Sequence, residues 1–104
     1  VVAISDSPIG VDIERVKARG GYVEMAKMFM TNDEIAGFEM WDITRQRDYF
    51  YDLWVAKEAI FETKSKPEQA GASIANISLE NFQGSVVTLP CFNEEYMMAI
   101  AVKK

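Results

Sequence analysis

One stretch decides how this chain folds: residues 53–61, which read LWVAKEAIF. Apolar side chains recur here at spacings of three and four, from Phe50 to Phe61, and this spacing is typical of a buried helix face. Lys57 and Glu58 interrupt the apolar segment. Charged side chains near a buried face rarely lack a partner, so each should meet an opposite charge. The alternative is that both lie on the solvated flank and only their alkyl stems pack.

The length and charge of the chain limit its class. Its 104 residues fit one small domain with a single core. A net charge of −5 argues against sequence-independent binding of nucleic acid. No apolar run approaches the roughly 20 residues that span a bilayer, and no signal peptide is visible, so we expect a cytoplasmic protein without a membrane partner. Because the chain starts at Val1 rather than Met, we expect a fragment of something longer.

The chain contains no histidine and a single cysteine. The absence of histidine excludes Ser-His and Cys-His nucleophilic schemes and removes the commonest zinc and haem ligand. One cysteine excludes an internal disulfide and a thiolate metal cluster. Any acid-base or metal chemistry must therefore rest on carboxylates, lysines, tyrosines or bound water.

The first part of the chain predicts two strands. Residues 1–4 form a short β-branched run, and residues 9–14 alternate strictly, which places Gly10, Asp12 and Glu14 on one face. If that face is solvated, the second segment is an ordinary amphipathic strand. If the face is covered, its two carboxylates need a cation or protons.

The middle of the chain is predicted to be helical. Residues 22–30 have apolar side chains at helical spacing. Thr31 and Glu34 have the form of a capping box, which predicts a second short helix to about Trp41. The longest helix should cover residues 46–63 and contain the opening stretch, before a break with proline and glycine ends it.

The last third changes from helical to alternating periodicity. We predict strands over residues 74–82, 85–89 and 96–102. The last of these is apolar throughout, so it should be central or covered by a partner. The expected fold is α+β: an antiparallel sheet of about five strands packed against a long helix, with two shorter helices.

Two charged motifs stand 40 residues apart: Gly-Val-Asp-Ile-Glu over residues 10–14, and Trp-x-x-Lys-Glu-Ala over residues 54–59. This pairing resembles the 4′-phosphopantetheinyl transferase superfamily, and most of all the C-terminal half of its surfactin-synthetase-activating type. The resemblance also includes the Ser-Pro-Ile of residues 7–9, the spacing from Phe29 to Glu34, and residues 48–54. One motif alone would be weak, but two at the family distance make a specific match.

The resemblance implies transfer of the 4′-phosphopantetheine arm of coenzyme A to a serine of an acyl or peptidyl carrier protein, releasing adenosine 3′,5′-bisphosphate. It implies that Asp12, Glu14 and Glu58 bind Mg²⁺ and the pyrophosphate, and that Lys57 lies close to the phosphates. Hard oxygen ligands with bound water suit magnesium. Glu58 or a metal-held water would be the base for the serine. Glu34 matches an additional acidic position of the family.

The chain departs from the family pattern in two ways. Glu62 stands where the family usually carries a phosphate-binding lysine, and Lys64 and Lys66 are the nearest lysines. We predict that Lys64 binds coenzyme A in place of the missing lysine, although in a helix its side chain points in another direction than that of position 62. A carboxylate at position 62 would repel pyrophosphate.

The second departure is length, because family members of this type consist of two similar halves in one chain. The resemblance therefore implies a missing N-terminal half or an identical subunit as a partner. The surface left open should be apolar and should support self-association. The candidates for that surface are Val1, Val2, Ile4, Tyr96, Met98 and Ile100. Two other readings stay open: a non-catalytic domain of this fold that serves in association, and an unrelated acidic metal-binding domain.

Overall fold

The computed structural model of the chain describes residues 8–17, 21–93 and 95–104. Its centre is a 20-residue helix, α3 (Ile43–Glu62), which begins after Asp42. The Asp42 carboxylate caps the helix by accepting a hydrogen bond from the Arg45 amide. The predicted long helix over residues 46–63 is thus confirmed, with three more residues at its start and one fewer at its end. Within the described residues, no helix combines the length and apolar character needed to cross a bilayer.

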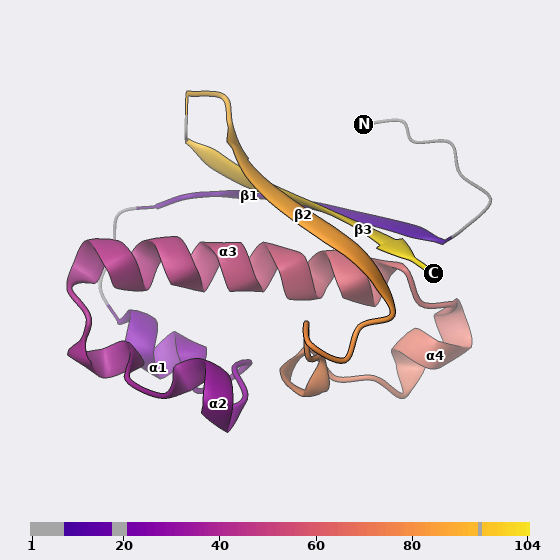
Figure 1. Cartoon of the computed structure of the whole chain (residues 1–104), viewed down its shortest axis with the longest axis horizontal. Coiled ribbons are helices and arrows are strands. Elements are labelled where there is room, and N and C mark those ends of the chain that lie inside the picture. The colour runs from indigo at the N-terminus through magenta and orange to yellow at the C-terminus, as the bar shows by residue number, and fades with distance from the viewer. Residues whose placement is uncertain (1–7, 18–20, 94) are drawn as a thin grey trace.

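A three-stranded antiparallel sheet covers one side of α3 (Figure 1). Its strands are β1 (Ile9–Arg15), β2 (Gly84–Cys91) and β3 (Tyr96–Lys103), in the order β1-β3-β2. The apolar last strand is therefore central, as its sequence predicted. The prediction of about five strands was wrong, since the described residues form three. Predicted residues 1–4 lie outside the described part of the chain.

The predicted strand over residues 74–82 is also wrong. The segment contains a 3₁₀ turn, η2 (Ile74–Asn76), followed by further turns. Ile74 and Ile77, three residues apart, pack against the core beside α3, whereas Leu79 is partly exposed. Asparagines at positions 76 and 81 favour turns over strand pairing. The alternating pattern of residues 74–82 therefore predicted the wrong structure, because the buried side chains here are three residues apart.

Short helices cover the other side of α3 (Figure 1). They are α1 (Tyr22–Ala26), α2 (Asn32–Ile35) and the 3₁₀ turn η1 (Phe38–Met40), while α4 (Lys66–Ala70) lies beyond the end of α3. The capping box of Thr31 and Glu34 is confirmed. The predicted helix from residue 31 to about 41 is interrupted after Ile35 by a turn, in which Ala36 has a non-helical ψ of 123° and Gly37 a positive φ of 77°.

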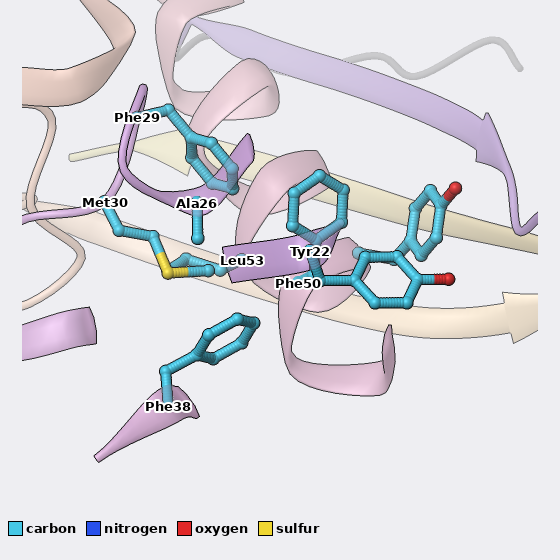
Figure 2. Close-up of a cluster of buried hydrophobic side chains, with 8 residues drawn as sticks. Tyr22, Ala26, Phe29, Met30, Phe38, Phe50 and Leu53 are labelled. Atoms are coloured by element: carbon cyan, nitrogen blue, oxygen red, sulfur yellow. The ribbon is translucent and has the colours of Figure 1, made fainter. Parts of the chain in front are cut away.

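Aromatic side chains fill the space between α3 and these short helices (Figure 2). Phe29 meets both Phe50 and Trp54 edge to face, with ring centroids 5.3 and 5.0 Å apart. The Tyr22 and Phe50 rings lie 5.4 Å apart. A second, smaller cluster of Val55, Ala59, Ile60, Ile77, Ala99 and Ala101 joins α3 to the sheet. The long helix is thus packed on two opposite sides.

Candidate active site

The strand β1 crosses α3 at very short range. An added Cβ at Gly10 would lie 1.7 Å from the Ala59 carbonyl oxygen, so only glycine permits this approach. Across β3, Gly10 pairs with Ala101 and Asp12 pairs with Ala99, and both alanines are fully buried. Small residues at these positions let the helix lie directly on the sheet. The face with Gly10, Asp12 and Glu14 is therefore covered, which decides between the two alternatives for this strand.

The two charged motifs meet where β1 faces α3. The Trp54 indole N–H donates a hydrogen bond of 3.3 Å to Glu14 Oε1, across 40 residues of sequence. Asp12, Glu14 and Glu58 are all half-buried in the same region. Glu62, one helical turn beyond Glu58, acts electrostatically on both Asp12 and Glu58. The structure thus joins four carboxylates into one cluster, which we call the acidic cluster.

Burial and charge repulsion raise the pKa values of two members of this cluster. Burial first, and then the carboxylates of Glu14, Glu58 and Glu62, raise the pKa of Asp12 from 3.8 to about 7. Burial followed by Glu14 and Glu62 also raises the pKa of Glu58. Asp12 Oδ2 is buried and has no hydrogen-bond partner among the described residues. A buried carboxylate oxygen without a donor, surrounded by like charges, is a position that a cation or a proton would stabilise.

The predicted magnesium ligands Asp12, Glu14 and Glu58 all belong to this cluster. Within the described ranges, no group of three acidic, histidine or cysteine side chains is already arranged to hold a metal ion. The chemistry of the donors nevertheless fits magnesium, which takes hard oxygen ligands and completes its shell with water and substrate oxygens. The unpartnered Asp12 oxygen agrees with that fit. Asp12, Glu14 and Glu58 are the residues that would hold the ion.

Lys57 lies on the other side of α3 from the acidic cluster, although it precedes Glu58 in the sequence. Its side chain is fully buried, and its ammonium contacts Glu34 Oε1 at 2.7 Å and the Phe29 carbonyl oxygen at 2.8 Å. The solvated alternative for this lysine was therefore wrong. Its predicted contact with phosphates stays a prediction. Sequence reasoning singled out both Lys57 and Glu34, but no sequence signal paired them.

Lys64 follows the end of α3 and lies apart from the acidic cluster. It lines a cavity of about 310 Å³ with residues that include Thr63, Phe82 and Lys103. Its backbone carbonyl accepts a hydrogen bond from the Gln69 side chain. Its predicted role in coenzyme A binding also stays a prediction.

An apolar cavity of about 680 Å³ opens beside the acidic cluster. Glu14 and Trp54 line one part of it, and Met25, Phe29 and Ile74 line other parts. The sequence did not indicate Met25 and Ile74 as pocket residues. They come from α1 and from the η2 segment, which are far apart in sequence and line the same cavity. The arrangement offers an apolar chamber next to carboxylates, which suits a ligand with an apolar arm and a charged end.

Comparison with known proteins adds an independent finding. Residues 8–101 match the model of the 4′-phosphopantetheinyl transferase superfamily. A 4′-phosphopantetheinyl transferase of Bacillus subtilis is 30% identical over 111 residues, covering 96% of this chain and 49% of that protein. The 4′-phosphopantetheinyl transferase psf-1 of Bacillus pumilus is 28% identical, covering 100% of this chain and 48% of its own length.

A third relative is the 4′-phosphopantetheinyl transferase Sfp of Bacillus subtilis (strain 168). It is 36% identical over 66 residues, which cover 64% of this chain and 29% of that protein. The chain therefore spans about half the length, or less, of the curated relatives that it matches.

Proposed function

The chain belongs to the 4′-phosphopantetheinyl transferase superfamily, and from this premise we propose that it forms one half of an enzyme that modifies carrier proteins. The proposed reaction moves the 4′-phosphopantetheine arm of coenzyme A to a serine hydroxyl of an acyl or peptidyl carrier protein. The serine oxygen forms a new bond to the β-phosphorus of coenzyme A, and the pyrophosphate bond breaks. Adenosine 3′,5′-bisphosphate leaves, and the serine proton is released.

The single observation that carries the proposal is the state of Asp12. Its buried Oδ2 has no donor in the described part of the chain, and three further carboxylates act on it. A carboxylate in that setting favours a divalent cation. We propose Mg²⁺, held by Asp12, Glu14 and Glu58 together with substrate oxygens. When bound, the ion would neutralise the negative charge of the pyrophosphate.

Other features of the chain would accept the serine proton, hold the Glu14 carboxylate and receive the substrate. Glu58, whose pKa is raised by burial and by neighbouring carboxylates, is the candidate to accept the serine proton. The Trp54 indole holds the Glu14 carboxylate by its hydrogen bond. The apolar cavity beside Glu14 would receive the arm of the substrate, next to the carboxylates that hold its charged end.

The outer face of the sheet supports the proposed partner, a second half or an identical subunit. Pairing places Val11, Ile100 and Val87 side by side on the face away from α3, and Ile13, Met98 and Leu89 form the next row. Val87 is 58% exposed and Ile13 is 44% exposed. Tyr96, Met98 and Ile100 were predicted for this surface, and Val1, Val2 and Ile4 lie outside the described residues. A partner that covers this face would bury a continuous apolar surface.

A second candidate function is a non-catalytic domain of the same fold that serves in protein association. Glu62 favours it, because a fourth carboxylate in the acidic cluster opposes binding of pyrophosphate. The cytoplasmic location expected from the sequence remains a prediction under either function.

The deciding experiment is incubation with coenzyme A, Mg²⁺ and an apo carrier protein, followed by mass spectrometry of the carrier. We expect the mass gain of the arm from a polypeptide that contains the second half, and loss of that gain in Asp12→Asn. The exposed Glu39→Gln is the matched control and should retain transfer. No transfer from the longer polypeptide would refute the enzyme and leave the association function.

A further inference from the structure

The Lys57 ammonium is the most deeply buried charge of the described chain. The side chain of Lys57 is 0% exposed and that of Glu34 is 15% exposed. The ammonium donates to the Phe29 carbonyl and also lies 5.9 Å from the centre of the Phe29 ring. Burial of an ammonium is unfavourable unless its donors are satisfied, and here two oxygens satisfy it at short range.

One carboxylate oxygen serves two partners at this point. Glu34 Oε1 accepts both from the Lys57 ammonium and from the Thr31 backbone N–H, at 2.7 and 2.8 Å. The Thr31 hydroxyl in turn accepts from the Glu34 backbone N–H. The capping box of α2 is therefore bonded directly to α3. Helix α2 has four residues and none of them is fully buried, so this ion pair, beside the packing of Ile35 on the core, is a direct link between the two helices.

The direction of the Lys57 side chain is tied to the rotation of α3 about its own axis. Successive residues of a helix point about 100° apart, so the direction of Lys57 determines the direction of Glu58. Lys57 points toward the α1–α2 side, and Glu58 points toward β1 and the acidic cluster. An apolar side chain at position 57 would fill the same space without a fixed direction, whereas hydrogen bonds from an ammonium have one.

We infer that Lys57 is a positioning residue, which orients Glu58 and Trp54 through its buried ion pair with Glu34. This inference rests on the proposed function for its catalytic consequence, but its structural part concerns the chain alone. It differs from the phosphate contact that the resemblance implies, because the ammonium already has two protein partners and no exposed surface.

The first test is a double-mutant cycle on unfolding of the free chain. Lys57→Met removes the ammonium, and Glu34→Gln removes the counter-charge but keeps a capping box, since glutamine serves there as well as glutamate. We expect each single variant to lose stability. The double variant should deviate from additivity by roughly tenfold in the unfolding equilibrium constant. The exposed pair Lys27 and Glu24, changed in the same way, is the control and should show no coupling.

The second test reads the orientation directly, through the Trp54 indole N–H. Because this group lies one turn before Glu58 and donates to Glu14, its NMR resonance and exchange rate report how α3 faces β1. We expect both to change in Lys57→Met and in Glu34→Gln, while the Trp41 indole serves as an internal reference. If Lys57→Met does not fold, Glu34→Gln alone still breaks the pair from its partly exposed side.

The third test separates positioning from phosphate contact in the two-half enzyme. A positioning role predicts that both single variants lower kcat by roughly 10–100-fold with little change in the KM for coenzyme A. A phosphate contact predicts a raised KM for coenzyme A in Lys57→Met and normal kinetics in Glu34→Gln. Additive stabilities, an unchanged Trp54 signal or that second kinetic pattern would each overturn the inference. Absence of transfer by the unmodified enzyme would refute the proposed function, and the first two tests would still decide on the ion pair.

Discussion

The charged side chains on the two sides of α3 lie in opposite electrostatic environments. On the side of the short helices, the buried Lys57 ammonium pairs with Glu34 at 2.7 Å and lies 5.9 Å from the centre of the Phe29 ring. On the side of the sheet, Asp12 and Glu58 belong to a cluster of four carboxylates, and burial and repulsion raise the pKa values of both. Lys57 and Glu58 are neighbours in sequence, yet one is paired with an opposite charge and the other lies among like charges.

This difference separates structural from functional charge. A buried charge that is paired within the protein, as Lys57 is by two oxygens, contributes to the fold and has no surface exposed to a ligand. Carboxylates that repel one another, with a buried oxygen lacking a donor, reduce stability unless something binds. The side of α3 that faces β1 is therefore where we place the chemistry.

The largest expected effect comes from Gly10, which brings the two motifs together. Gly10→Ala would place a Cβ against the Ala59 carbonyl oxygen and force β1 away from α3. Since backbone atoms cannot move aside as a flexible side chain can, we expect a loss of about 3 kcal/mol in the free energy of unfolding. Urea denaturation measures this change. Gly71→Ala is the control, because an added Cβ there meets no atom within 4 Å; equal losses in both variants would contradict the close packing.

The next effect concerns the pH dependence of stability that Asp12 causes. The folded pKa of Asp12, about 7, lies above the unfolded value, so Asp12 keeps its proton to a higher pH in the folded state than in the unfolded state. The free energy of unfolding therefore falls as the pH rises from about 4 to 7. Asp12→Asn should remove this loss and stabilise the metal-free chain by about 1–2 kcal/mol at pH 8, with water screening the half-exposed group. It should have no such effect below pH 4.

Thermal unfolding at pH 3.5 and pH 8 would measure this contrast. Glu80→Gln, on an exposed turn, is the control and should have similar small effects at both values. Destabilisation by Asp12→Asn at pH 8 without Mg²⁺ would show that Asp12 is satisfied after all.

A third prediction extends the comparison to the outer face of the sheet. We expect the chain to self-associate through this face, and Val87→Lys should raise the dissociation constant roughly tenfold by placing a charge among its apolar side chains. Sedimentation equilibrium measures the constant. Met40→Lys is the control, because Met40 is 85% exposed on η1, on the helical side. A chain that is monomeric at high concentration would refute the prediction.

The smallest effect is expected at Glu62, the exposed member of the acidic cluster. Glu62→Lys should lower the pKa values of Asp12 and Glu58 and tighten coenzyme A binding by roughly three- to tenfold, since repulsion of the pyrophosphate becomes attraction. Titration calorimetry with Mg²⁺ present measures the affinity. Glu80→Lys makes the same change in net charge on a distant turn, and an equal gain there would show that only the overall charge matters.

Much of the fold could be predicted, because local patterns and burial agree over most of the chain. Strict alternation predicted β1, and the apolar run of β3 predicted its central place. Helical spacing predicted α3, and the Thr31 and Glu34 side chains predicted the start of α2. The prediction was wrong for residues 74–82, where packing against α3 overrides a local alternation.

The sequence by itself determined the family, the motif residues and the long helix, because residue type and spacing along the chain are enough for these. It could not determine which side of α3 each charge occupies, since Lys57 and Glu58 are equivalent to any pattern of residues 53–61. The tertiary structure decided that, through the close approach of Gly10 to Ala59 on one side and the capping box of α2 on the other. Burial then paired one charge with Glu34 and set the other among carboxylates, where we propose that a ligand binds, because only three-dimensional packing removes water from a charge.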